Sequence, residues 1–401
     1  MAGREQPLTG IVVVDLGQIY NGPYATLLMA LAGARVIKVE PPQGEHLRGR
    51  ARVEGAGAPL VLLNSNKLGV TLNLKAEGGR ELLLELVQRA DVVVENFRPG
   101  VMERLGVGEP TLHEANPRLI YASGSGFGST GPYRDYPAMD LTVQAIAGVM
   151  STTGYPDQPP VKAGPAVCDF MGGIHLYAAV ATALFERERT GRGSTVEASM
   201  FESIYPALMS SLGLLLGGGA PEGAPLRTGN RHNGLAEAPY NVYPTSDGYL
   251  TIICVGDHHW RELAAAMGRP ELGDDERYAT RRSRVERMDE IDALVEGWTS
   301  DRLKEELFAG LRERGVPCAP VRELDEVAAD PHLHERGLLT EIDHPDTGPI
   351  PGLNSPLRFA GVERAELRPA PGLGEHNDHV YGELLGLDAD RRSELAAQGV
   401  I

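Results

Sequence analysis

One carboxylate, Asp169, lies where an apolar run meets a long apolar helix, and it is the first candidate for chemistry in this chain. The helix is predicted over residues 170–188, and the Thr-Gly-Arg-Gly sequence at 190–193 ends it. Free backbone N–H groups and the helix dipole stabilise a carboxylate at a helix start. The pattern therefore predicts a fixed, ionised aspartate, with nearby glycines that leave room for a ligand. A purely structural N-cap is the alternative, because aspartate is common at that position.

The neighbouring thiol of Cys168 is a rival nucleophile. A catalytic cysteine needs a base to become a thiolate, and His175 lies about two helical turns further along, which is too far to serve. We therefore interpret Cys168 as a small buried hydrophobic residue. The chain also lacks the G-x-x-x-x-G-K-[ST] phosphate loop and the G-x-S-x-G elbow, so neither chemistry is expected.

Composition limits the partners and the compartment. The 401 residues are enough for a large core and two domains, and the formal net charge of −17 argues against a nucleic-acid partner and against an anionic membrane surface. Three widely spaced cysteines favour a reduced, cytoplasmic protein and give no zinc site. The histidine pairs at 258–259 and 332–334 lack acidic or cysteine partners at ligand spacing, so no metal site is expected.

Strands and helices alternate through the first two hundred residues, and this pattern predicts a parallel α/β sheet. Each predicted strand ends in a loop rich in Gly, Asn or Arg, and ligands of such sheets bind at the carboxyl ends of the strands. We predict strands at residues 11–16, 34–40, 69–74, 90–95, 118–123 and 195–198, with helices at 24–32, 77–89, 101–105 and 200–216.

The remaining chain predicts a second, smaller domain. A Gly/Pro-rich linker at 217–225 precedes a hairpin at 243–253 with Asp247-Gly248 at its turn, and two charged helical stretches follow at 258–268 and 283–314. We expect a large domain from residues 1–216 and 330–401, a small α+β domain at 226–325, and connectors at 217–225 and 326–370. Residues 330–370 read as extended, irregular chain, and the tail at 380–385 and 389–398 as helix.

Basic residues gather in or near the strand-end loops, although the whole chain is acidic. Such a cluster favours a phosphorylated ligand, whereas the alternative for each residue is a solvated surface position. The residues are Arg48, Arg50, Arg52, Lys67, Lys75, Arg98 and Arg104. The glycine series at 124–131 does not fit the dinucleotide fingerprint, because no helix follows it, so we expect its glycines to let the backbone approach some other ligand.

With these residues assembled, the chain resembles the class III coenzyme A transferase family, which includes formyl-CoA transferase, carnitine CoA-transferases and a branch of α-methylacyl-CoA racemases. The resemblance is carried by LTGIVVVDL at residues 8–16, GARVIKVE at 33–40, NSNK at 64–67, LNLK at 72–75 and DVVVENFRPG at 91–100. It continues through NPRLIY at 116–121, Asp169 and TGRG at 190–193, and so runs nearly end to end.

The resemblance implies that Asp169 is the catalytic nucleophile and that Asp140 can assist it. It implies a large Rossmann-like parallel-sheet domain built from both chain ends, a small α+β domain, and an interlocked, ring-like homodimer, with a hetero-oligomer as the alternative. The CoA thioester would be a substrate, with no permanently bound cofactor. The family's CoA-contacting positions fall on Tyr20, Asn21, Leu72, Asn73, Lys75, Asn96, Phe97, Arg98 and Arg104.

The implied reaction transfers CoA from an acyl-CoA to a small carboxylic acid through an aspartyl-CoA thioester. Arg231 and His232 are hypothesised to receive a second carboxylate, as in succinyl-CoA. The alternatives are an acyl-CoA racemase and a non-catalytic CoA-binding subunit. The racemase branch carries a histidine before the residue aligned with Asp140, where this chain has Met139, and this difference disfavours racemisation.

Overall fold

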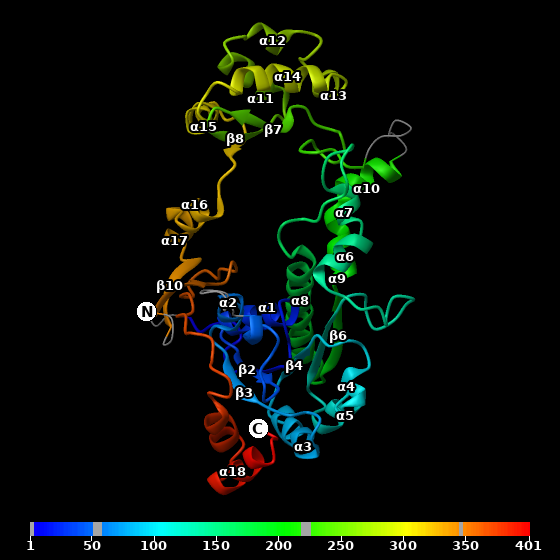
Figure 1. Cartoon of the computed structure of the whole chain (residues 1–401), viewed down its shortest axis with the longest axis vertical. Coiled ribbons are helices and arrows are strands. Elements are labelled where there is room, and N and C mark those ends of the chain that lie inside the picture. Colours follow the sequence, from blue (N-terminus) through cyan, green and yellow to red (C-terminus); the bar gives the residue numbers. More distant parts are fainter. Residues whose placement is uncertain (1–3, 51–57, 218–225, 345–347) are drawn as a thin grey trace. The chain divides into compact units, whose positions relative to one another are not determined.

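The computed structural model describes residues 4–50, 58–217, 226–344 and 348–401 (Figure 1). Arg52 and all but the first residue of the expected linker at 217–225 lie outside the described residues. The chain divides into two compact units. The first comprises Met1–Val143, Pro165–Ile204 and Asp330–Ile401, and the second comprises Gln144–Gly164 and Tyr205–Ala329.

The second unit includes two stretches that we expected in the large domain, Gln144–Gly164 and residues 205–216. The backbone explains this grouping for Gln144–Gly164. The Gly229 N–H donates to the Gly154 carbonyl at 3.0 Å, and Asn233 Nδ2 donates to the Thr152 carbonyl at 3.2 Å. These bonds are made with the chain beyond residue 225, and the sequence pattern of 144–164 gives no sign of them.

A six-stranded sheet, parallel throughout, forms the centre of the first unit, in the order β3-β2-β1-β4-β5-β6. Val14 of β1 pairs with Ile37 of β2 on one side and with Val93 of β4 on the other. This order confirms the predicted parallel α/β sheet and is the Rossmann order. The strands are β1 (Val12–Asp15), β2 (Arg35–Glu40), β3 (Leu68–Thr71), β4 (Val92–Glu95), β5 (Ile120–Ser125) and β6 (Ser194–Ser199).

Helices cover both faces of this sheet because successive strand residues point to opposite sides. Val13 packs with α1 (Asn21–Leu31) and α8 (Val167–Thr190) on one face. Val14 packs with α3 (Glu77–Val87) and α5 (Glu109–Ala115) on the other. Both faces of the sheet are therefore buried, which is why its strands read as continuous apolar runs. The shorter helices of this unit are η1 (Arg48–Arg50), α2 (Ala58–Asn64), α4 (Val101–Arg104), α6 (Asp140–Ile146, which continues into the second unit) and α9 (Met200–Ile204).

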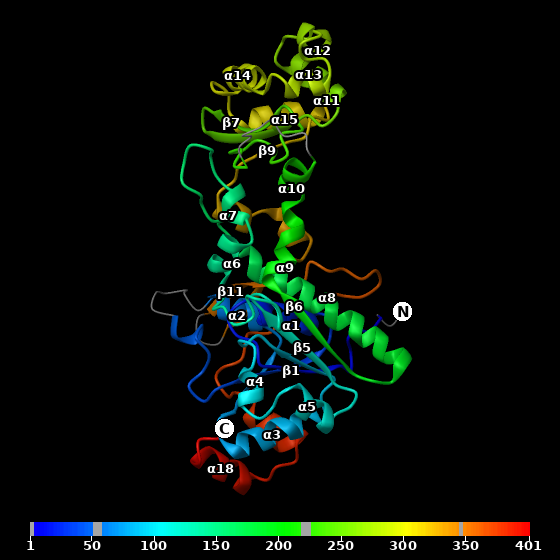
Figure 2. The same cartoon turned by 90° about the vertical axis from the view of Figure 1, so that its right-hand side faces the viewer.

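Helix α8 runs along the sheet beside β5 and β6 (Figure 2). By length and composition it is the one described helix that could cross a membrane. In this fold Leu176, Val180 and Leu184 of α8 are buried against the sheet, and the helix carries Asp169 in its first turn.

The C-terminal residues complete the first unit at its edge strand β3. The Thr71 N–H donates to Asn377 Oδ1 at 3.0 Å, the Tyr381 hydroxyl donates to the Thr71 carbonyl at 2.8 Å, and the Asn73 N–H donates to the Val400 carbonyl at 2.7 Å. These bonds cover an edge that would otherwise expose unpaired backbone groups. The tail elements are the π-helical η3 (Asp378–Leu384) and α18 (Ala389–Ala397).

The expectation of irregular chain over residues 330–370 is wrong for much of that segment. It contains α17 (Pro331–Glu335) and an antiparallel pair, β10 (Leu339–His344) and β11 (Gly348–Leu353), in which Ile342 pairs with Ile350. The sequence did not indicate this strand pair, because β11 is rich in proline and glycine, which usually indicate a loop. A strand tolerates proline at an edge, where the missing N–H is not needed for pairing.

The second unit is built on the antiparallel sheet β7-β8-β9, with the predicted turn at Asp247-Gly248 between its first two strands. Trp260 lies at its core and donates from Nε1 to the Leu272 carbonyl at 2.8 Å. The helical stretch expected at 283–314 is three helices, and the last of them begins at Lys304, whose N–H donates to Asp247 Oδ1 at 2.8 Å. The elements are β7 (Tyr240–Thr245), β8 (Gly248–Ile253), β9 (Cys318–Pro320), α7 (Val149–Thr152), η2 (Tyr205–Leu208), α10 (Met209–Leu216), α11 (Asp257–Ala266), α12 (Glu271–Asp274), α13 (Arg281–Val285), α14 (Met288–Thr299), α15 (Lys304–Glu313) and α16 (Leu324–Ala328).

Candidate active site

Two cavities lie at the carboxyl ends of the strands in the first unit. The strand order reverses between β1 and β4, and ligands of open α/β sheets bind in the crevice at such a point. The loop after β1 and the loop after β4 both line these cavities, and Gln18, His46 and Phe97 line both of them. The two cavities therefore adjoin.

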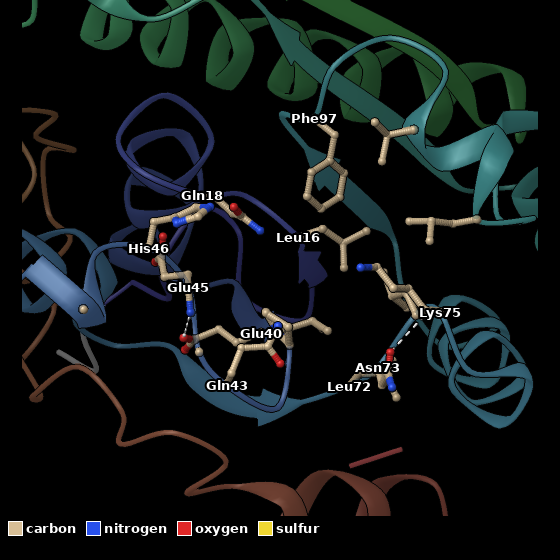
Figure 3. Close-up of a pocket in the computed structure, with 17 residues that line it drawn as sticks. Leu16, Gln18, Glu40, Gln43, Glu45, His46, Leu72, Asn73, Lys75 and Phe97 are labelled. Carbon is tan, nitrogen blue, oxygen red and sulfur yellow. Dashed lines mark hydrogen bonds between the residues drawn. The ribbon is translucent and has the colours of Figure 1, made fainter. Parts of the chain in front are cut away.

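The larger cavity has a volume of about 970 Å³. Asn73 and Lys75 lie at one end of it and Gln18 and His46 at the other, and Glu40, Gln43 and Glu45 also line it (Figure 3). A large cleft with both apolar and polar walls suits a long ligand that carries apolar and polar parts. The apolar lining comes chiefly from Leu16, Val39, Leu72, Leu74, Phe97 and Leu105.

The smaller cavity has a volume of about 450 Å³ and contains Asp169. Asp169 is the one acidic residue among the described residues that line it. The other walls come from the loops after β1, β4 and β5, together with Ala138 and Met139. We refer to this space as the Asp169 cavity.

Asp169 lies in the first turn of the helix, as the sequence predicted, but it is not the N-cap residue, which was the alternative interpretation. Helix α8 begins at Val167, so Asp169 is its third residue. The capping oxygen is Oδ1 of Asp140, which accepts the Cys168 N–H at 2.8 Å and the Asp169 N–H at 3.3 Å. Because a carboxylate from another helix satisfies these donors, the Asp169 side chain is available to the cavity.

The expectation that Asp169 is simply ionised is wrong. Burial, and then the nearby Asp140 carboxylate, raise the pKa of Asp169 to about 7. No hydrogen bond from the described residues reaches its carboxyl oxygens. A carboxylate without such donors is poorly stabilised and therefore reactive as a nucleophile once it has lost its proton. Burial also raises the pKa of Cys168 to about 12, so that thiol is inert.

Three glycines near Asp169 make room for Asn21 of the protein itself rather than for a ligand. A Cβ on Gly172 would collide with Asn21 Nδ2, and one on Gly124 would collide with Asn21 Oδ1. A Cβ on Gly173 would lie 2.7 Å from the Asn21 carbonyl oxygen. Asn21 is thereby buried at the start of α1, where its Nδ2 donates to the Asp169 carbonyl at 3.3 Å. A similar correction applies to Gly126, where a Cβ would meet Ala138.

Comparisons with known proteins show the family to which the chain belongs. Residues 8–377 match the description of "CoA-transferase family III". The chain belongs to CoA-transferase family III. It is 38% identical over 387 residues to the acetyl-CoA:oxalate CoA-transferase of Acetobacter aceti, with 96% of this chain and 97% of the relative covered.

A second relative and a solved structure extend the comparison. The succinyl-CoA–D-citramalate CoA-transferase of Chloroflexus aurantiacus is 37% identical over 402 residues, covering 99% of this chain and 98% of the relative. The crystal structure of a CAIB/BAIF family protein from Brucella suis matches with a TM-score of 0.82 at 35% identity, covering 95% of this chain and 100% of that chain. These matches confirm the family resemblance, and the protein is a CoA-transferase.

In this CoA-transferase the residues predicted to contact CoA are distributed around the two cavities. Leu72, Asn73 and Lys75 line the larger cavity, and Phe97 lines both. Three more, Asn21, Asn96 and Arg98, line the Asp169 cavity. The remaining two line neither cavity: Tyr20 stacks on Phe170 with ring centroids 6.0 Å apart, and Arg104 lies on α4 with its guanidinium beside Gly100.

Two members of the predicted basic cluster are held within the protein and do not face a ligand. Lys67 is buried and donates from Nζ to Asp15 Oδ2 at 2.9 Å. Arg48 makes two bonds of 2.7 Å to the Glu40 carboxylate. Burial without a partner would cost several kcal/mol, so each cation is matched by an acid of the same unit. The other members whose burial the structure describes are exposed, and no ion pair reaches them from the described residues: Lys75, Arg98 and Arg104.

The structure also identifies cavity residues that the sequence analysis did not single out. Gln18 is held by two bonds of 2.8 Å between its backbone and the Asn96 side chain. The next residue, Ile19, has a φ of 65° and donates its N–H to Glu45 at 3.0 Å, and Glu45 pairs with buried Lys38 at 2.8 Å. The sequence placed these residues in loops that follow predicted strands, where a ligand is expected. No feature of the sequence distinguished them from the other residues of the same loops.

Arg231 and His232, which were hypothesised to receive a second carboxylate of the substrate, lie in the second unit and already have partners within the protein. Arg231 lies 2.7 Å from Asp289 and 2.6 Å from Asp292. His232 accepts the Gly234 N–H at Nδ1 at 3.1 Å, and its ring packs edge-on against Tyr240. Arg231 is therefore paired with two aspartates, and this pairing disfavours the hypothesis that it receives a second carboxylate. No group of three or more His, Cys, Asp and Glu residues arranged to hold a metal occurs in the described ranges.

Proposed function

We propose that this CoA-transferase moves coenzyme A from an acyl-CoA to a free carboxylic acid through a covalent aspartyl-CoA thioester on Asp169. The observation that carries the proposal is the placement of Asp169 as the one acid lining the smaller cavity among the described residues. The larger cavity adjoins it and is suited to the long arm of CoA. The thioester would then lie at the junction, near Gln18, His46 and Phe97.

The first half of the proposed reaction releases the donor acid. A carboxylate oxygen of Asp169 attacks the thioester carbonyl, the carbon–sulfur bond breaks, and CoA leaves as a thiolate from a mixed anhydride. The thiolate then attacks the Asp169 carbonyl carbon, the anhydride carbon–oxygen bond breaks, and the donor acid leaves as its carboxylate. Asp169 is left as a CoA thioester, and the activation of the original thioester is retained.

The second half repeats these steps in reverse with the acceptor. The acceptor carboxylate attacks the aspartyl thioester, CoA thiolate leaves, and the thiolate then attacks the acceptor carbonyl of the new anhydride. The products are the new acyl-CoA and the free Asp169 carboxylate. Asp140 contributes by holding the first turn of α8 and by raising the pKa of Asp169.

The remaining details of the proposal concern CoA recognition and context. Lys75, Arg98 and Arg104 are the exposed cations available to the CoA phosphates. Succinyl-CoA is our proposed donor, an interlocked homodimer our proposed assembly, and the cytoplasm our proposed compartment. Exposed apolar side chains such as Phe185 and Leu216 support an assembly of subunits.

A transfer assay tests the proposal. The purified protein is incubated with acyl-CoA donors and free acids, and new acyl-CoA is measured by chromatography. Asp169→Asn is expected to abolish transfer, whereas Asp157→Asn, an exposed aspartate outside both cavities, is expected to leave it unchanged. Transfer at the wild-type rate by Asp169→Asn contradicts the proposal. Solvent deuterium entering the α-carbon without CoA transfer indicates the racemase alternative.

A further inference from the structure

The loop that follows β1 lies at the junction of the two cavities, and its backbone is held in place. Gln18 lines both cavities, and Ile19 lines the Asp169 cavity. The backbone of Gln18 makes two bonds of 2.8 Å with the Asn96 side chain, but no hydrogen bond from the described residues reaches the side-chain amide of Gln18. The structure therefore fixes the backbone of Gln18 and leaves its amide group to a ligand.

Ile19 has a backbone conformation that a β-branched residue rarely adopts. Its φ of 65° lies in the left-handed region, where the Cβ atom crowds the backbone. Such a conformation costs free energy, and it persists only where the surrounding structure imposes it. An interaction with the rest of the protein must therefore hold Ile19 in this conformation.

A buried ion pair supplies that interaction. The side chains of Lys38 and Glu45 are 0% and 1% exposed, and Lys38 Nζ lies 2.8 Å from Glu45 Oε1. The other carboxylate oxygen, Glu45 Oε2, accepts the Ile19 N–H at 3.0 Å. Lys38 Nζ also donates to the Gly17 carbonyl at 3.1 Å. The ion pair therefore bonds to the loop on both sides of Gln18.

Glu45 is itself anchored to the end of β2, and it lies on the same side of the larger cavity as Gln18 (Figure 3). The Glu45 N–H donates to Glu40 Oε2 at 3.0 Å, and Arg48 holds the Glu40 carboxylate with two bonds of 2.7 Å. A buried ion pair is weak evidence for stability, because taking two charges out of water can cost as much free energy as their attraction provides. The other side-chain hydrogen bonds of Lys38 and Glu45 both go to one loop. Placement of that loop therefore explains the pair better than stability does.

We propose that Glu45 is a positioning residue for CoA transfer, which holds Ile19 in the left-handed conformation and so keeps Gln18 at the junction of the two cavities. The inference rests on the proposed function, in which the thioester lies at that junction. A small misplacement of a residue beside the reacting atoms lowers the rate of the chemical step more than it lowers the affinity for the substrate. Loss of Glu45 should therefore slow transfer and leave the binding of CoA intact.

Substitution of Glu45 in three backgrounds at position 19 tests this proposal. Glu45→Gln leaves one acceptor oxygen, so either the Ile19 N–H or Lys38 loses its partner. We expect kcat for CoA transfer to fall roughly ten- to a hundred-fold, while the Kd for free CoA, measured by calorimetry, changes less than about three-fold. In an Ile19→Gly background the left-handed conformation carries no penalty, so Glu45→Gln should lower kcat less than about three-fold. Ile19→Ala also shortens the side chain but keeps the Cβ atom, so in that background the full loss should remain.

Two further variants separate positioning from folding. Glu45→Asp keeps the charge beside Lys38 but is one methylene shorter, and in the same three backgrounds we expect the same order of losses. Asp91→Asn breaks the 2.9 Å ion pair between Asp91 and Arg187, which lies outside both cavities. That control should lower the melting temperature without changing kcat.

The possible outcomes separate this inference from the proposed function. An unchanged kcat in Glu45→Gln, a loss of CoA affinity as large as the loss of kcat, or equal losses in all three backgrounds overturns the positioning role of Glu45, while CoA transfer by the wild type stands. Absence of CoA transfer by the wild type, or transfer that survives Asp169→Asn, overturns the proposed function and this inference with it.

Discussion

At the scale of single residues, the proposed reaction depends on the protonation state of Asp169. A carboxylate is the reactive form, and burial together with Asp140 raises the pKa of Asp169 to about 7. The rate of the step that uses Asp169 should therefore fall as the pH is lowered through about 7. Met139 also lines the Asp169 cavity and cannot exchange a proton there, so this position offers no second acid or base for racemisation.

Replacement of the second carboxylate gives a direct test of this electrostatic coupling. Asp140→Asn keeps an oxygen that can accept the Cys168 N–H but removes the negative charge. The pKa of Asp169 should fall, so the acid limb of the rate profile should move to lower pH. The measurement is kcat against pH for the variant, the wild type and Asp157→Asn. An acid limb that stays in place, or moves upward, contradicts the coupling.

The sequence could predict the identity of the central residue but not its state. The apolar run before Asp169 and the long helix after it are local features that drew attention to this carboxylate, but its role as the nucleophile was implied only by the family resemblance. Its raised pKa comes from burial and from Asp140, which lies in a different helix. Likewise, Lys67 and Arg48 read as ligand-binding cations because their acidic partners, Asp15 and Glu40, become neighbours only in the folded chain.

At the scale of elements, the approach of α1 to α8 determines the shape of the site. Gly172 and Gly173 remove side chains from the face of α8 that meets Asn21. Asn21 can then donate to the Asp169 carbonyl and reach the cavity. The pair of glycines in an otherwise apolar helix is therefore explained by close helix packing.

Two separate glycine-to-alanine variants, one at the site and one as a control, test this packing. Gly172→Ala places a methyl group against Asn21 Nδ2, so we expect lower stability, by about 1–3 kcal/mol, and at least a ten-fold loss of transfer activity. The control is Gly310→Ala in α15, where the added Cβ meets no heavy atom within 4 Å. That variant should be up to about 1 kcal/mol more stable, with normal activity. Chemical unfolding and the transfer assay measure both effects, and unchanged behaviour of Gly172→Ala rules out the packing role.

Elements with strong periodicity could be predicted from the sequence, and elements set by long-range bonds could not. The strands β1 to β6 and helix α8 were expected close to where they lie, because each is a continuous apolar or periodic run. The break before Lys304 and the pairing of β10 with β11 were missed. The first depends on Asp247, far away in sequence, and the second occurs in a segment whose prolines suggest a loop.

At the scale of the whole molecule, the two ends of the chain belong to the same compact unit. The last seventy residues belong with the amino-terminal sheet, and their Val380 and Tyr381 are fully buried in the core that contains Val14. The family resemblance implied that both chain ends build one domain, whereas composition alone gave no reason to pair them. The tail therefore contributes to the stability of the unit that holds Asp169.

Replacement of one buried tail residue tests that contribution. Val380→Ala should lower the free energy of unfolding by about 2 kcal/mol, because it leaves a cavity in the core beneath the sheet. Leu324→Ala, at a side chain that is 83% exposed, should change it by less than about 0.5 kcal/mol. Denaturant unfolding of both variants measures the difference, and equal effects would show that the tail is not part of the core.

The most direct test of the central claim is to trap the covalent intermediate. The protein is incubated with an acyl-CoA donor, treated with hydroxylamine, digested and examined by mass spectrometry. We predict a hydroxamate on Asp169 that forms only when the acyl-CoA is present and that is absent from Asp169→Asn. Full transfer activity with no modification of Asp169, or a hydroxamate on another residue, would contradict an aspartyl-CoA thioester at this position.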